Sequence, residues 1–188
     1  MPLIYESLKL LTKNDVYDPL EDSFLLARAV EEYAFGKTID IGTGSGIQGM
    51  VAAKKGCDVT FVDIDPDALE CARANASENG VIGNFIQSDL FESVAEKYNT
   101  VIFNPPYLPS QRVGSRKNLD LALDGGRDGR EVIERFLSQY GEHVLEDHTI
   151  LMVESSLNKY ERDLKRLGAE TVGIVHNFFE DLVVLKFK

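Results

Sequence analysis

Short apolar runs alternate with segments of helical period along most of this chain, and this alternation limits the fold that it can adopt. Apolar runs of strand length fall at residues 37–42, 57–65, 81–89, 99–104 and 148–154. The segments between them carry apolar residues three and four positions apart, which is the spacing of an amphipathic helix. Because parallel strands need crossover connections, the pattern predicts a doubly wound, mostly parallel sheet with helices on both faces.

The expected helices can be placed by their spacing and end signals. We expect helices over residues 18–33, 47–56, 66–79, 129–144 and 157–167. Asp18 and Asp65 each precede a proline and are typical N-cap residues, because their side chains can accept a hydrogen bond from the first helical turn. Residues 105–128 show no clear period and are expected to form a loop.

The C-terminal segment predicts an antiparallel addition to the sheet. Residues 170–177 and 181–188 have strand character, and only a short turn with Phe178 and Phe179 separates them. Strands joined so closely pair antiparallel, so we expect seven strands, one of them antiparallel within a C-terminal hairpin. The length of 188 residues suits a single domain over residues 1–188.

The acidic composition restricts the partners that this chain can bind. Thirty-one acidic side chains stand against 20 basic ones, and the formal charge of −11 disfavours direct binding to nucleic acid or to an anionic membrane. No apolar run reaches membrane length, and no secretory signal pattern opens the sequence. Cys57 and Cys71 lie in no CxxC pattern, so a reducing, cytoplasmic location is expected.

A glycine-rich turn follows the first of these strands and is the first candidate ligand site. Its residues are Gly42, Thr43, Gly44, Ser45 and Gly46. Three interpretations are open: a turn without a ligand, a dinucleotide site that also uses Gly49, and a site for a cationic nucleoside such as S-adenosylmethionine. Asp40 favours the last, because a carboxylate at the mouth of the turn would repel pyrophosphate and attract an amino or sulfonium group.

Carboxylates also follow the next two strands. Asp63 ends the second strand and can accept hydrogen bonds from both hydroxyls of a ribose. Asp89 follows the third strand and is either an acceptor for the exocyclic amine of adenine or a solvated turn residue, while Leu90 would pack on the ring. Together with Asp40, these residues outline a site for a nucleoside with a cationic tail.

The fourth strand ends in the sequence NPPY, which comprises Asn104, Pro105, Pro106 and Tyr107. The two prolines fix φ and contribute no donor, so the turn is stiff and offers the Asn104 side-chain oxygen and the Pro105 carbonyl as acceptors. Such a pair suits a planar –NH2 group, on which Tyr107 could stack. The other interpretation is a structural turn, since Asn-Pro sequences are common in turns.

The combination of these motifs resembles a known family. The segments DIGTGSG, VDIDPDAL, QSDLF and NPPYLP resemble those of HemK-type glutamine methyltransferases, which act on protein release factors. VYDPLEDSFLL and LALDGGRDGREVIERF resemble the archaeal and eukaryotic branch, which lacks an N-terminal helical domain. The resemblance implies a Rossmann-like class I methyltransferase fold, S-adenosyl-L-methionine as the cofactor, and a small zinc-binding activator subunit as a partner.

The same resemblance assigns roles to individual residues. It implies cofactor contacts from Ser23, Asp40, Gly42 to Gly46, Asp63, Asp89, Leu90 and Asn104. The substrate glutamine would be held by Asn104 through Tyr107. No metal site is expected in this chain. No catalytic base is needed, because the amide proton can leave to water after the methyl transfer.

Other functions remain open from the sequence. The NPPY slot could methylate an amino group of adenine or guanine, which would have to be flipped out of its stack, or a protein lysine. A non-catalytic module that keeps the fold is a further alternative. The third strand is expected at an edge of the sheet, where its apolar residues either bind the activator or are covered by the chain's own helices; these residues are Val81, Ile82, Phe85 and Ile86.

Overall fold

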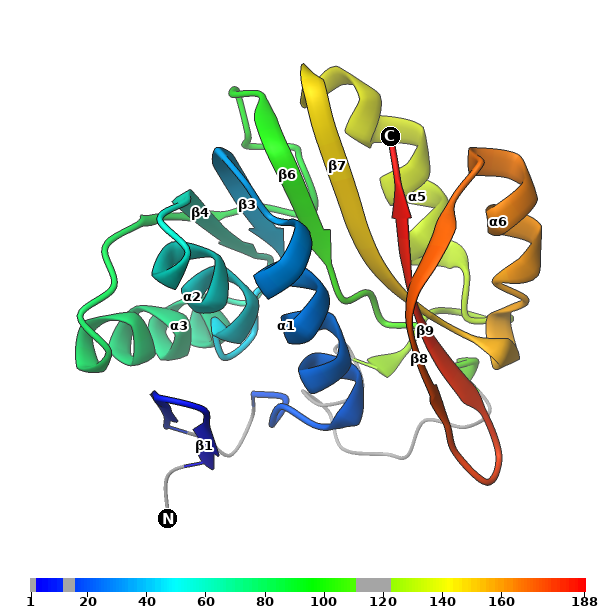
Figure 1. Ribbon diagram of the computed structural model, residues 1–188, viewed down its shortest axis with the longest axis horizontal. Helices are drawn as coiled ribbons and strands as arrows, with labels where there is room; N and C mark the ends of the chain where they lie inside the picture. The colour runs from blue at the N-terminus through cyan, green and yellow to red at the C-terminus, as the bar shows by residue number, and fades with distance from the viewer. Residues whose placement is uncertain (1–2, 12–15, 111–122) are drawn as a thin grey trace.

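A seven-stranded sheet forms the centre of the computed structural model, which describes residues 3–11, 16–110 and 123–188 (Figure 1). The strands lie in the order β5-β4-β3-β6-β7-β9-β8. Their bounds are β3 (Lys37–Ile41), β4 (Asp58–Asp63), β5 (Asn84–Gln87), β6 (Tyr98–Phe103), β7 (Val144–Ser155), β8 (Glu170–His176) and β9 (Asp181–Phe187).

Strand direction confirms the fold expected from the sequence. Strands β5, β4, β3, β6 and β7 pair in parallel, and β9 runs antiparallel to both of its neighbours, β7 and β8. The sheet is therefore doubly wound and mostly parallel, with one antiparallel strand in a C-terminal hairpin. Parallel pairing also brings the carboxyl ends of β3, β4, β5 and β6 to one edge, where the motifs of the sequence follow.

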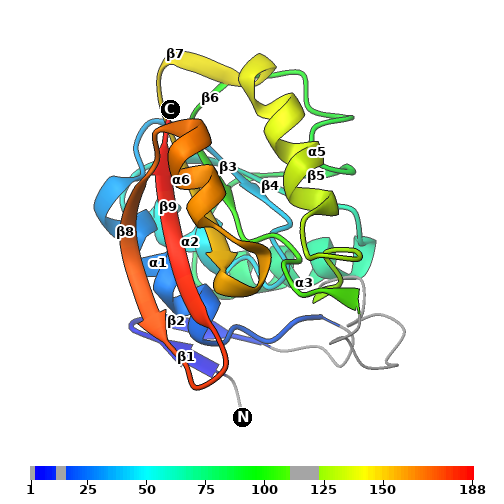
Figure 2. The same ribbon diagram turned by 90° about the vertical axis from the view of Figure 1, so that its right-hand side faces the viewer.

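Helices cover both faces of the sheet, as Figures 1 and 2 show. The helices α1, α2 and α3 lie on one face, and α5 and α6 lie on the other. Their bounds are α1 (Glu21–Tyr33), α2 (Ile47–Lys54), α3 (Pro66–Glu78), α5 (Glu131–Gln139) and α6 (Glu161–Leu167). Within the described residues, no helix is long and apolar enough to cross a membrane.

The central strands are buried on both faces, which explains their continuous apolar sequences. In β3 and β6, Ile39 pairs with Val101 and Ile41 with Phe103, and all four side chains are buried. The Phe103 ring stacks on Phe136 of α5, with 4.6 Å between the ring centroids. The strand that leads into the NPPY turn is therefore fixed both by its neighbours in the sheet and by a helix.

Two predicted helix ends are wrong. Asp18 does not cap α1, because the helix begins at Glu21 with Leu20 at the N-cap position. Val16, Tyr17 and Pro19 of the preceding segment line a cavity instead. Val144 begins β7 rather than ending a helix, since the 3₁₀ turn η2 (Tyr140–Glu142) terminates α5. By contrast, Asp65 caps α3 as predicted, because its side chain accepts the Asp67 N–H at 2.9 Å.

Three other elements differ from the sequence-based expectation. The third strand, β5, is short, and Val81 and Ile82 precede it. The helix expected from residue 157 begins at Glu161, after the 3₁₀ turn η3 (Ser156–Asn158). The N-terminal strands β1 (Leu3–Tyr5) and β2 (Leu8–Leu10) form an antiparallel hairpin that the sequence did not predict. These strands are too short to show a period of two.

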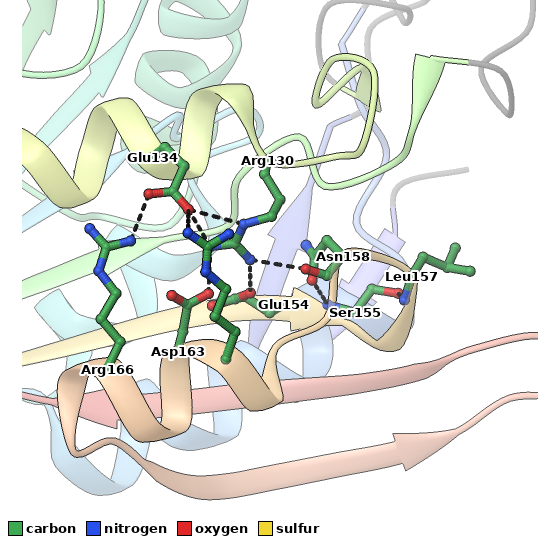
Figure 3. Close-up of polar contacts among 9 residues, drawn as sticks. Arg130, Glu134, Glu154, Ser155, Leu157, Asn158, Asp163 and Arg166 are labelled. Atoms are coloured by element: carbon green, nitrogen blue, oxygen red, sulfur yellow. Dashed lines mark hydrogen bonds and ion pairs between the residues drawn. The ribbon is translucent and has the colours of Figure 1, made fainter.

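A buried ion cluster around Arg130 connects the segment after the NPPY turn to β7 and α6 (Figure 3). The Arg130 guanidinium lies 2.6 Å from Asp163 of α6, 3.3 Å from Glu154 of β7 and 2.8 Å from Glu134 of α5. It also donates a hydrogen bond to the Asn158 carbonyl at 3.0 Å. The side chains of Glu154 and Asp163 have no exposed surface.

These carboxylates make Arg130 hard to replace. Burial, reinforced by the Asp163 charge, raises the pKa of Glu154 well above its usual range. The Arg130 charge opposes this shift. Removing the cation would therefore leave two acidic groups in a site that water does not reach, which is far more costly than losing an ion pair at the surface.

We expect Arg130→Ala to lower the free energy of unfolding by about 3–5 kcal/mol, because Glu154 and Asp163 lose their buried cation. Urea unfolding followed by circular dichroism measures the change. The matched control is Arg166→Ala, since Arg166 contacts the same Glu134 at 2.7 Å on the surface. An exposed pair contributes about 0–1 kcal/mol. Equal effects of the two substitutions would contradict the importance of the buried contacts.

Candidate active site

A cavity of about 320 Å³ opens at the edge of the sheet where β3, β4 and β6 end. Its lining contains most of the residues predicted to form the site, although they come from widely separated parts of the sequence. These are Ser23, Gly42, Thr43, Gly44, Ser45, Asp63, Asp89, Leu90, Asn104, Pro105, Pro106 and Tyr107. Asp40 and Gly46 are the two predicted site residues that do not belong to this lining.

Asp40 lies beneath the glycine-rich turn, so its expected position at the mouth of the turn is wrong. The side chain is buried, and its Oδ2 accepts hydrogen bonds from the Thr43 hydroxyl at 2.6 Å and from the Gly49 N–H at 2.9 Å. Burial raises the pKa of Asp40 to about 7, although both hydrogen bonds favour the charged form. Asp40 therefore connects Thr43 in the turn to Gly49 in the first turn of α2.

Gly46 also acts on the shape of the turn. It occupies the N-cap position of α2 with a φ of +84°, which side chains with a Cβ rarely adopt. A Cβ on Gly46 would lie 3.1 Å from the Cβ of Ala72 in α3. The glycine thus lets α2 begin close to α3, while the residues on either side of it face the cavity.

Asp63 joins the end of β4 to the same turn. Its two carboxylate oxygens accept the Gly44 N–H at 2.9 Å and the Asp65 N–H at 3.0 Å. Burial raises the pKa of Asp63, and these backbone hydrogen bonds oppose the rise. Each carboxylate oxygen has a second lone pair, so Asp63 keeps the capacity to accept hydroxyl groups from a ligand in the cavity.

Asp89 has a partner that the sequence did not predict. The Arg135 guanidinium of α5 donates a hydrogen bond to Asp89 at 2.8 Å, and both residues line the cavity. Leu90 is buried beside it with a φ of +50°, an unusual backbone conformation for leucine. The structure thus fixes Asp89 by an ion pair at the half-exposed cavity wall, and orients Leu90 by its backbone.

The NPPY turn is held by Asp22, a buried residue that the sequence analysis did not select. Asp22 Oδ2 accepts a hydrogen bond from the Asn104 Nδ2 at 3.0 Å, across 82 positions of sequence. Its Oδ1 accepts from the Ser23 N–H at 2.7 Å and from the Tyr17 hydroxyl at 3.1 Å. Because a carboxylate must face the –NH2 end of the amide, Asp22 determines which way Asn104 points.

This orientation leaves the other end of the Asn104 amide available. Asn104 Oδ1 is buried and has no hydrogen-bond partner within the described residues. A buried acceptor of this kind is costly unless a ligand satisfies it. The signal for Asp22 was present in the quoted segment YDPLEDSF, but only the tertiary structure brings that segment against the NPPY turn.

Residues 15–177 match a protein-family model described as a methyltransferase small domain. The matched region contains Asp40, the glycine-rich turn, the carboxylates Asp63 and Asp89 after it, and the NPPY turn. The chain belongs to this methyltransferase family.

Similar proteins of known name agree with the resemblance noted in the sequence. A protein of Methanocaldococcus jannaschii named as a protein N5-glutamine methyltransferase is 36% identical over 86% of this chain and 83% of its own length. Methyltransferase HEMK2 of Homo sapiens is 36% identical over 65% of this chain and 64% of its own length. The release factor glutamine methyltransferase of Deinococcus radiodurans is 33% identical, with this chain spanning 46% of its length.

Solved structures show the same fold. The E. cuniculi Mtq2–Trm112 complex, described as responsible for methylation of the translation termination factor eRF1, contains a chain with a TM-score of 0.72 and 25% identity. The match covers 93% of this methyltransferase and 98% of that chain. An rRNA methyltransferase of T. thermophilus has a TM-score of 0.70 at 18% identity, over 91% of this chain and 43% of its own, and supports the fold alone.

Two glycines of the segment after NPPY let this segment pack closely against the NPPY turn of the methyltransferase. A Cβ on Gly125 would lie 2.5 Å from the Pro106 carbonyl oxygen, and one on Gly129 would overlap the Tyr107 carbonyl oxygen. The Leu108 N–H also donates to the Leu123 carbonyl at 3.1 Å, so the two ends of the long loop pair with each other. Residues 111–122 of the predicted loop lie outside the described residues.

Two aromatic side chains of the cavity lining, Tyr17 and Tyr107, lie close to carboxylates. Burial raises the pKa of both Tyr17 and Tyr107, and the negative charges of Asp22 and Glu180 add to both shifts. The two phenols therefore stay neutral over the physiological range. Among the described residues, no cluster of three or more His, Cys, Asp or Glu side chains could hold a metal ion.

Asp40 is expected to make the stability of this methyltransferase depend on pH. Its pKa is 3.8 in the absence of structure and about 7 in the fold, so between these values only the folded chain keeps the proton. The free energy of unfolding should therefore fall, through this residue, as the pH rises through this range. Asp40→Asn cannot titrate, so the stability advantage of the wild type over this variant should shrink with rising pH.

Urea unfolding of the wild type and of Asp40→Asn at several pH values measures this difference. Asp65→Asn serves as a matched control, because Asp65 is a partly exposed cap after the next strand and its hydrogen bond to the Asp67 N–H survives the change. A wild-type advantage over Asp40→Asn that stays constant with pH would contradict the raised pKa.

Proposed function

We propose that this enzyme transfers a methyl group from S-adenosyl-L-methionine to the side-chain amide nitrogen of a glutamine in a protein, with a translation release factor as the expected substrate. The observation that carries the proposal is the buried Asn104 Oδ1, which Asp22 leaves without a partner within the described residues. The names of the relatives, which include protein-glutamine and release factor glutamine methyltransferases, support it. We expect the reaction in the cytoplasm, where release factors act.

The cavity residues fit S-adenosyl-L-methionine. Asp63 would accept the ribose hydroxyls, Asp89 would accept the adenine amine, and Leu90 would pack against the ring. The turn from Gly42 to Ser45 and the backbone at Ser23 would border the amino acid end. When bound, the cofactor supplies an electrophilic methyl group on a sulfonium. The acidic lining suits its positive charge.

The chain's contribution to the reaction is to hold the amide nitrogen in line with the methyl carbon. An amide is a poor nucleophile because its lone pair is delocalised. We propose that Asn104 Oδ1 and the Pro105 carbonyl accept its two N–H groups and stabilise the positive charge that develops on nitrogen. Tyr107 would cover the flat amide and exclude water. The proton then leaves to water, so His143, His148 and His176 have no required role.

Methylation of a nucleic-acid base or of a protein lysine by the same slot is the alternative that the sequence left open. The formal charge of −11 disfavours unaided binding to nucleic acid. A lysine nitrogen is not planar in either protonation state, and it becomes nucleophilic only after it loses a proton, whereas the paired acceptors suit a planar –NH2 group. These arguments favour the glutamine substrate.

The proposed reaction is tested by transfer of a labelled methyl group. The enzyme, with any subunit that co-purifies with it, is incubated with labelled S-adenosyl-L-methionine and a purified release factor, tRNA or histone. We expect label in the release factor, and mass spectrometry should place it on a glutamine. Label on lysine or on nucleic acid alone would overturn the proposal.

Asp63 and Asn104 should affect different steps. Asp63→Ala removes a charge-assisted acceptor and should weaken cofactor binding by about 1.5–3 kcal/mol. Asn104→Ala should leave cofactor affinity nearly unchanged and lower turnover by about a hundredfold, because its oxygen acts on the substrate amide. Calorimetry measures affinity, single-turnover methylation measures the rate, and circular dichroism verifies the fold. Unchanged affinity for Asp63→Ala, or parental turnover for Asn104→Ala, would remove that residue from its assigned role.

We propose that a small activator subunit, with a zinc site of its own, binds the exposed edge strand β5. The E. cuniculi relative forms a complex with Trm112, which supports such a partner. Strand β5 is an edge strand, as the sequence predicted, and Ile82 beside it is 92% exposed. Phe85 is partly covered by the chain itself, since its ring stacks on Phe61 at 4.6 Å and lies under Arg73.

Ile82→Glu should leave the isolated chain folded but abolish binding of the activator, because it places a charge on an apolar contact. The matched control is Ile174→Glu on β8, at the opposite edge of the sheet, where the side chain is 44% exposed. Co-purification of each variant with the activator measures binding. Retained binding by Ile82→Glu, or full activity of the isolated wild-type chain on a release factor, would contradict the proposal.

A further inference from the structure

Two adjacent phenylalanines stand in solvent at the tip of the β8–β9 hairpin. Phe178 is 93% exposed and Phe179 is 78% exposed, which makes them exceptional in a chain that buries most of its large apolar side chains. Their rings contact each other edge to face, with 4.8 Å between the centroids. A partner that covers such an exposed apolar pair removes its surface from water, which stabilises the complex.

The turn does not need these side chains for its own structure. It is closed by a hydrogen bond of 2.9 Å from the Asn177 N–H to the Glu180 carbonyl. Such turns usually carry Gly, Asn, Asp or Ser, whose backbones or short side chains favour the geometry. The aromatic pair therefore calls for an explanation outside the hairpin.

The hairpin tip lies beside the substrate slot. It projects past the edge of the sheet at which β3, β4 and β6 end (Figure 1). The Ser155 hydroxyl, at the end of β7, donates to Glu180 at 2.7 Å, and the Asp181 N–H donates to the Ser156 hydroxyl at 3.0 Å. Strand β7 is the neighbour of β6, which leads into Asn104. Burial raises the pKa of Tyr107 most, and the Glu180 charge at the tip adds to the rise.

Acidic side chains predominate around the cavity and the tip, since the described lining holds five aspartates (Asp22, Asp63, Asp65, Asp89 and Asp124) against one basic residue, Arg135, and Glu180 lies in the hairpin turn. Tyr17, which lines the cavity, has a pKa raised by burial, by Asp22 and then by the charges of Glu180 and Asp18. Asp18 comes from the segment before α1 and Glu180 from the hairpin, so carboxylates approach the slot from two sides. This surface would therefore select a polypeptide that carries basic residues close to an apolar residue.

We propose that Phe178 and Phe179 dock the protein substrate, by covering an apolar side chain in a basic segment that flanks the methylated residue. This inference rests on the proposed function, since it requires a protein substrate in the NPPY slot. Aromatic side chains, phenylalanine included, are enriched at protein–protein interfaces relative to the rest of the surface. The pair would position the polypeptide, while Asn104 and Tyr107 act on its side chain.

The test uses the double substitution Phe178→Ser/Phe179→Ser, in the enzyme with any subunit that co-purifies with it. The matched control is Leu145→Ser, which removes a 38% exposed side chain at the opposite end of the sheet. Methylation of a purified release factor gives KM and kcat, calorimetry gives cofactor affinity, and sedimentation gives the oligomeric state. We expect the double variant to raise KM about tenfold or more. Its kcat and cofactor affinity should match those of the wild type, and Leu145→Ser should change nothing.

The outcomes separate this inference from the proposed function. If the wild type methylates a release-factor glutamine and the double variant has the same KM, the docking role is wrong while the proposed function stands. If the wild type does not methylate a protein glutamine at all, the proposed function fails first. A double variant that changes only the oligomeric state, with an unaltered KM, would assign the aromatic pair to a contact between copies of this chain and overturn the docking role.

Discussion

The buried carboxylate of Asp40 is the interaction on which the rest of the site depends. It lies at the end of the central strand β3, where it binds Thr43 and the N–H of Gly49. These two hydrogen bonds hold the turn against the start of α2. The Asp63 carboxylate then binds the Gly44 N–H from the neighbouring strand. Two carboxylates thus satisfy backbone donors that would otherwise be unpaired, and the cavity takes its shape from the turn that they fix.

A second contact completes the site from the other direction. Asp22, at the start of α1, orients Asn104 just after β6, so the NPPY turn depends on a helix that precedes the first strand of the large sheet. Gly125 and Gly129 have no Cβ, so the segment that contains them packs directly against the carbonyls of Pro106 and Tyr107. The Arg130 cluster anchors that segment to β7 and α6. Rigidity in the slot therefore comes from packing and charge on both sides of the sheet.

The sequence predicted features whose physical cause is local. Apolar runs identified the five parallel strands, and the short turn at Phe178 and Phe179 identified the hairpin. Asp65 before Pro66 identified the cap of α3, because that hydrogen bond spans only two residues. Glycines and carboxylates after the strands predicted a site at one edge, since parallel strands bring their carboxyl ends together. The predicted start of α1 was wrong because Val16, Tyr17 and Pro19 of the preceding segment line the cavity, a role that no local signal reveals.

By itself, the sequence determined the doubly wound sheet, the methyltransferase family and twelve of the residues that line the cavity. Periodicity and strand-end motifs carry that information, because they depend on residues close together in the chain. Only the tertiary structure decided that Asp40 lies under the turn, that Arg135 pairs with Asp89, and that Asp22 orients Asn104. These contacts join residues 9 to 82 positions apart. Which donor meets which acceptor over such separations is settled by the packing of helices on the sheet.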